Sequence, residues 1–83
     1  MIKIKTISYQ QENVLAEVEY DLDTELYSFM VSTKQSQIAK MTIQEIRDYI
    51  VGRVTTERTT KLRVIVEGLL SPLIDIDLSL IHI

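Results

Sequence analysis

The chain has 83 residues, of which 46% are hydrophobic and 25% charged, and its formal net charge at pH 7 is −3. This length allows one small domain, and two Gly and one Pro are too few for a linker or a low-complexity segment. The absence of Cys excludes disulfides, thiol catalysis and zinc held by cysteine. The only His, His82, lies at the very end, so the rest of the chain lacks the side chain best suited to proton transfer near neutral pH. We therefore expect a protein that is not an enzyme and that holds no metal or cofactor.

The N-terminal residues alternate in polarity from the start and lack the apolar stretch of a secretory signal. The apolar runs elsewhere are too short for a membrane-spanning helix. The sequence predicts a cytoplasmic protein without a membrane partner.

Three strands are predicted in residues 2–9, 14–20 and 26–32, joined by polar turns that suit hairpins. In the first strand, the apolar positions change phase at Ile7 and Tyr9, which indicates either a bulge or a strand covered partly on both faces. The second strand has the clearest alternation, with apolar side chains at Val14, Ala16, Val18 and Tyr20. Consecutive strands joined by short turns favour an antiparallel meander.

A helix is predicted from residue 43 to about residue 53, after a polar connection over residues 33–40. Thr42 and Glu45 have the spacing of a capping box, and Met41 and Ile46 that of a hydrophobic staple. The apolar positions recur at helical spacing, at Ile43, Ile46, Ile50 and Val54.

Four threonines in residues 55–60 are poor helix formers, so the helix is expected to end there. Residues 61–67 alternate at Leu62, Val64 and Val66, which predicts a fourth strand, and residues 74–77 are compatible with a fifth. The expected fold is a small two-layer α+β domain of β-β-β-α-β order, with a mostly antiparallel sheet and one amphipathic helix on one face.

Two clusters of charge have the composition of binding sites. Asp21, Asp23 and Glu25 match the start of a calcium loop, but the Gly and Glu that would complete such a loop are absent, which favours a solvated acidic turn. A basic stripe of four residues would suit contact with phosphates or with a partner protein: Arg53, Arg58, Lys61 and Arg63. The alternatives are a solvated face and pairing with the acidic hairpin, within one chain or between subunits.

The last six residues, 78–83, resemble translated sequencing-library DNA. One way to encode these six residues is CTG TCT CTT ATA CAC ATC, which matches the complementary strand of the transposase mosaic end. We interpret residues 1–77 as a single domain truncated at its C-terminus, read from the end of a metagenomic contig, and residues 78–83 as an artefact. The alternative is an apolar terminal strand.

Three functions are compatible with these features. The favoured one is a small non-enzymatic structural or protein-interaction component, of phage or mobile-element type, that forms a homo-oligomer or binds a protein partner. The second is a nucleic-acid- or nuclease-binding module that uses the basic stripe, which the acidic balance and the lack of interleaved aromatic residues disfavour. The third is the N-terminal fragment of a larger enzyme.

Overall fold

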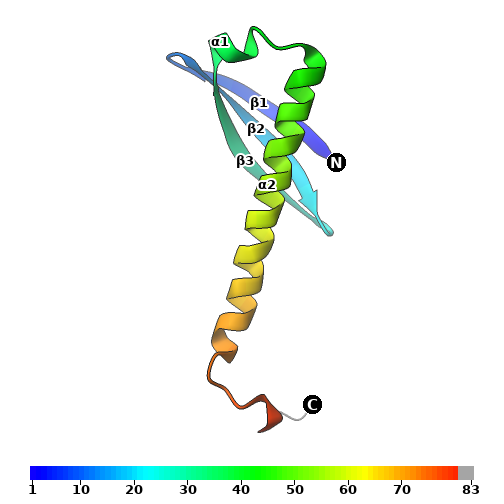
Figure 1. The fold of residues 1–83 in the computed structure, drawn as a ribbon, viewed down its shortest axis with the longest axis vertical. Helices are drawn as coiled ribbons and strands as arrows, with labels where there is room; N and C mark the ends of the chain where they lie inside the picture. Colours follow the sequence, from blue (N-terminus) through cyan, green and yellow to red (C-terminus); the bar gives the residue numbers. More distant parts are fainter. Residues whose placement is uncertain (81–83) are drawn as a thin grey trace.

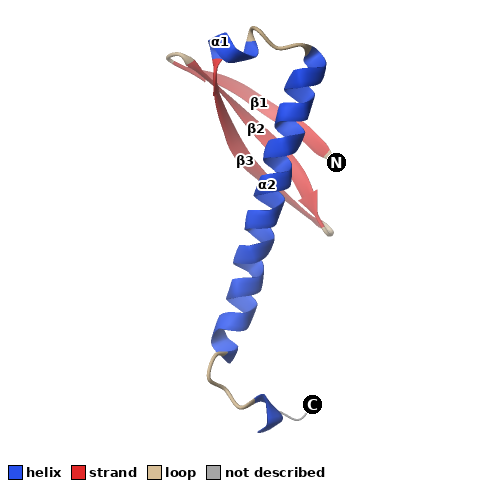
Figure 2. Cartoon of the chain, in the orientation of Figure 1, coloured by secondary structure: helices blue, strands red, loops and turns tan. Residues whose placement is uncertain are grey.

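The computed structural model describes residues 1–80 and shows an elongated α+β chain with extents of 60 × 25 × 18 Å (Figure 1). Three antiparallel strands, β1 (Ile2–Gln10), β2 (Asn13–Leu22) and β3 (Glu25–Lys34), form one sheet in the order β1-β2-β3. The short helix α1 (Gln35–Ile38) leads to the long helix α2 (Ile43–Leu70), and two single 3₁₀ turns follow, η1 (Ser71–Leu73) and η2 (Leu78–Leu80). The predicted α+β class and the antiparallel meander are confirmed (Figure 2).

The phase change predicted in β1 is a β-bulge. The register with β2 shifts between Ile4 and Thr6, which leaves Lys5 as the extra residue. Because successive side chains of a strand point to opposite faces, one inserted residue returns the following apolar side chains to the face they would otherwise leave. All four large apolar residues of β1 therefore share the face of Val18 and Tyr20: Ile2, Ile4, Ile7 and Tyr9.

The hydrophobic core lies between this face of the sheet and the N-terminal half of α2. It contains five buried side chains: Val18, Tyr20, Val31, Ile50 and Val54. The ring of Tyr20 packs edge-on against Phe29, with ring centroids 5.7 Å apart, and lies at a tilt to Tyr27. The core is small even for a chain of this length, and many large apolar side chains outside it are exposed.

Helix α2 begins where the sequence predicts. The Thr42 side chain accepts a hydrogen bond from the backbone N–H of Glu45, and the Glu45 carboxylate accepts one from the backbone N–H of Thr42. These two bonds complete the capping box and satisfy backbone donors that the helix itself cannot satisfy.

The predicted end of this helix and the predicted fourth strand are wrong. Residues 55–67 are helical, and α2 continues without a break to Leu70. The threonine hydroxyls donate to carbonyl groups one turn back, from Thr55 to Val51 and from Thr59 to Thr55, so they do not compete for other backbone groups. Contacts from Val54, Glu57 and Arg58 to the sheet hold this segment in place and outweigh its weak intrinsic propensity.

The strand pattern in residues 61–67 is also a helical pattern. Leu62, Ile65, Val66 and Leu69 recur at the three- and four-residue spacing that places side chains on one side of a helix. The fifth strand over residues 74–77 is absent too, because this segment forms turns and irregular backbone in which Asp75 has φ of 65°. Residues 81–83, the last half of the segment interpreted as an artefact, lie outside the described residues.

Two substitutions in α2 separate core packing from helix propensity. Val54→Ala removes two methyl groups from a fully buried site and should lower the free energy of unfolding by about 1–2 kcal/mol, after a small gain in helix propensity. Val64→Ala makes the same chemical change at a site that is 61% exposed and should leave stability unchanged or raise it by up to ~0.5 kcal/mol. Urea denaturation followed by circular dichroism measures both values. Equal effects would contradict the position of the core.

Candidate interaction surface

The predicted basic stripe does not form a single face. Because each helical residue advances the side chain by about 100° around the axis, the four positions spread over about 220° of the circumference of α2. Arg58 and Lys61 lie toward the sheet, whereas Arg53 and Arg63 are exposed on other sides of the helix. The stripe was predicted to run from the end of a helix into a strand. Because residues 53–63 instead belong to one continuous helix, the four side chains project in different directions around its axis.

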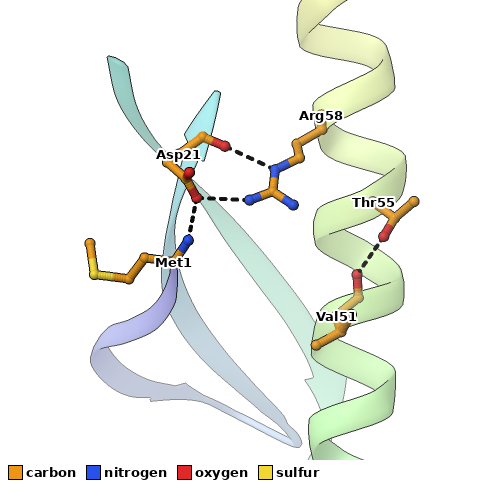
Figure 3. Close-up of polar contacts among 5 residues, drawn as sticks. All are labelled: Met1, Asp21, Val51, Thr55 and Arg58. Atoms are coloured by element: carbon orange, nitrogen blue, oxygen red, sulfur yellow. Dashed lines mark hydrogen bonds and ion pairs between the residues drawn. The ribbon is translucent and has the colours of Figure 1, made fainter. Parts of the chain in front are cut away.

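Arg58 joins the helix to the acidic hairpin of β2 and β3. Its Nε donates to the backbone oxygen of Asp21 at 2.9 Å, and its Nη2 donates to the Asp21 carboxylate at 2.8 Å (Figure 3). The N-terminal amine of Met1 donates to the same carboxylate oxygen. Hydrogen bonding from this amine, helped by the charge of Arg58, lowers the pKa of Asp21. Pairing between the acidic hairpin and the basic segment, one of the alternatives for the basic stripe, is thus confirmed within the chain for Arg58 and Asp21.

Lys61 is also engaged by the sheet. Its Nζ lies 4.7 Å from the centroid of the Tyr27 ring, which is within range of a cation–π contact. Two of the four basic residues therefore hold α2 against β2 and β3. Within residues 1–80, Arg53 and Arg63 make no ion pair.

No metal-binding cluster is found in the part of the chain that the structure describes. It contains no group of three or more His, Cys, Asp or Glu side chains placed to hold a metal ion. Asp21, Asp23 and Glu25 belong to the β2–β3 hairpin, where Asp23 has φ of 56° in a two-residue turn. Of the described helices, none is both long and apolar enough to cross a membrane.

Two polar contacts fix the helix above the core. The Tyr20 hydroxyl donates to the Glu57 carboxylate at 3.4 Å, and the hydroxyls of Thr33 and Tyr49 lie 3.0 Å apart. Burial of the phenol and the nearby negative charge of Glu57 raise the pKa of Tyr20. Both effects disfavour the phenolate in the folded state.

The main exposed feature is the projecting end of α2, residues 62–70, which extends past the sheet (Figure 1). Six of its nine residues are apolar, and only Arg63 and Glu67 are charged. Four of the apolar residues lie within about 100° of each other around the axis and define an apolar stripe: Leu62, Ile65, Val66 and Leu69. Leu62, Val66 and Leu69 are exposed, with Leu69 at 70%, whereas Ile65 is half-buried.

A second apolar feature lies beside the first half of the helix. An open groove of about 460 Å³ runs between β1 and α2, and six residues line it: Ile2, Ile4, Ile46, Arg47, Ile50 and Val51. It exists because α2 leaves the start of β1 partly uncovered, and the bulge at Lys5 keeps Ile7 and Tyr9 on the same face further along the strand. Ile4 and Ile7 are about half exposed there.

Comparison with protein-family models, curated proteins and solved structures found no match.

The raised pKa of Tyr20 predicts a loss of stability in alkali. Below about pH 10 both the folded and the unfolded chain keep this phenol protonated, so its contribution is fully present. As the pH rises through the unfolded value toward the raised folded value, the unfolded state ionises first and stability falls. A tyrosinate absorbance titration should show a late component that Tyr20→Phe removes. Tyr9→Phe, at a 70% exposed site, should leave that component in place, and the opposite result would contradict the Tyr20–Glu57 contact.

Proposed function

We propose that this protein is a non-enzymatic interaction component whose contact surface is the projecting end of α2. The observation that supports this proposal is the exposure of a helical segment that is apolar on most of its circumference. A helix of this kind is normally buried against other elements, because water-exposed apolar side chains leave the hydrophobic free energy of burial unrealised.

The distribution of charge indicates which side of the projecting end a partner would cover. Arg63 and Glu67 lie on one side of the helix, about 100–160° from the centre of the apolar stripe. The stripe is thus the side that a partner would cover, while the two charges stay in water. Large exposed apolar patches mark sites of protein interaction in soluble proteins.

The sheet supplies a rigid base for this surface. Val54 in the core, the ion pair of Arg58 with Asp21 and the cation–π contact of Lys61 with Tyr27 hold α2 up to the residue before the projecting end. A partner therefore meets a segment whose direction is already set, which lowers the entropy lost on binding.

A photo-crosslinking amino acid tests the proposal at one position of the stripe. Placed at Leu69, it should form discrete protein adducts, in purified protein or in cell extract, at least several-fold more efficiently than at Glu67. Glu67 belongs to the same exposed segment and lies about 160° around the helix, so it controls for exposure and local motion. Mass spectrometry of the adducts identifies the contacting chain. Equal labelling at the two positions, or no adduct at Leu69, would contradict the proposed contact surface.

A further inference from the structure

We propose that the apolar stripe binds a second copy of this chain, in a twofold symmetric dimer in which the two α2 helices pack antiparallel. This inference rests on the proposed function and names the partner. The projecting end of each α2 would lie along the first half of the other α2 and cover the groove beside β1.

The apolar stripe is continuous with the rim of the groove along α2. Positions on one side of α2 alternate in four- and three-residue steps, the repeat that keeps a seam of side chains facing a partner helix: Val51, Thr55, Arg58, Leu62, Ile65 and Leu69. The groove ends at Val51, which is at one end of this seam, and the apolar stripe occupies the other end. Arg47 and Val51, two of the residues that line the groove, thus lie on the same side of the helix as the apolar stripe.

This surface is also complementary to a second copy of itself. A twofold axis requires each patch to meet its own copy in reverse order. Val51 and Leu69 lie equally far from Thr60 along the helix, in opposite directions, and so do Thr55 and Ile65. An axis at the level of Thr60 therefore places Leu69 of one copy against Val51 and the groove of the other. Near the axis, Arg58 turns its guanidinium to Asp21 of its own chain and leaves its alkyl stem to the seam.

Charge complementarity at the helix ends also favours the antiparallel dimer. The last turn of α2 contains no basic residue, although the C-terminal end of a helix carries partial negative charge on its free carbonyl groups. Arg47, which lines the groove, is exposed and makes no ion pair within the described residues. In the antiparallel register Arg47 lies about 4.5 Å past the level of Leu70, the last residue of α2, in the second copy. Each copy thus supplies the cation that the other helix lacks.

The area of this contact indicates a reversible dimer. The helical overlap runs from residue 50 to residue 70, about 30 Å, and a strip about 10 Å wide gives roughly 300 Å² per chain. The groove walls at Ile2 and Ile4 add to this area. A standard stable interface buries about 800 Å² per partner, so the dimer falls in the class of weak, concentration-dependent complexes.

Cysteine crosslinking tests the partner and the register together, because the chain has no cysteine of its own. The double variant Val51→Cys, Leu69→Cys should form a covalent dimer with oxidised glutathione, and reductant should dissolve it. Each single variant should stay monomeric on the gel, since antiparallel pairing separates the two copies of residue 51 by about 27 Å, far beyond the ~7 Å limit between the Cα atoms of a disulfide. Crosslinking of the single variants would show parallel pairing and overturn the proposal.

Arg47 provides a second test in the intact fold, because it is exposed and lies outside the core. Arg47→Gln should weaken dimerisation by about 3- to 30-fold in sedimentation equilibrium, since two symmetric contacts with helix ends are lost. Arg53→Gln, the matched control on another side of α2, should leave the dissociation constant unchanged. Equal effects of the two variants, or a wild-type chain that stays monomeric at millimolar concentration, would overturn the dimer. If Leu69 then still formed adducts with a different protein, the proposed function would stand with another partner.

Discussion

The packing of Tyr20 against α2 is the interaction on which the rest of the structure depends. Its side chain is completely buried between two aromatic rings of β3 and the helix, and its hydroxyl requires a polar partner there. Glu57 supplies that partner from the helix, three residues after Val54 enters the same core. This pair sets both the position of α2 along the sheet and its rotation about its own axis.

The position of α2 has two consequences for the surface. The helix crosses the sheet over β2 and β3, so apolar side chains of β1 stay partly exposed beside it, both before the bulge, at Ile4, and after it, at Ile7. The helix is also longer than the part of the sheet that it covers, so its last residues extend into solvent (Figure 1). A groove and an apolar stripe result, and the rotation of α2 places both on the same side of the helix.

Much of the fold could be predicted from the sequence because it is determined by local sequence patterns. The alternation of Val14 to Tyr20 predicted β2, the phase change before Ile7 indicated the bulge, and the capping box of Thr42 and Glu45 gave the start of α2. Each of these features is determined by residues that are close together in the chain, so a single sequence is enough to predict it.

The length of α2 and the interaction surface could not be predicted in the same way. Threonines at residues 55–60 weaken a helix on their own, and only contacts with Asp21 and Tyr20, far away in the sequence, show why the helix continues. Leu62, Val64 and Val66 satisfy the period of a strand as well as Leu62, Ile65 and Leu69 satisfy that of a helix. Because the helix was predicted to end too early, the four basic residues were interpreted as a stripe and the apolar residues as part of a strand. The helical spacing of Leu62, Ile65 and Leu69 was the signal that could have revealed the apolar stripe.

Amide hydrogen exchange across α2, measured at several protein concentrations, tests most directly whether the projecting end is a contact surface. The account predicts that amides of residues 62–70 exchange more slowly as concentration rises, while those around Ile50 and Val54 are protected at every concentration by the core. In a Leu62→Glu, Leu69→Glu variant the concentration dependence should vanish and the protection around Val54 should persist. Exchange in residues 62–70 that is independent of concentration and identical in the variant would contradict the account.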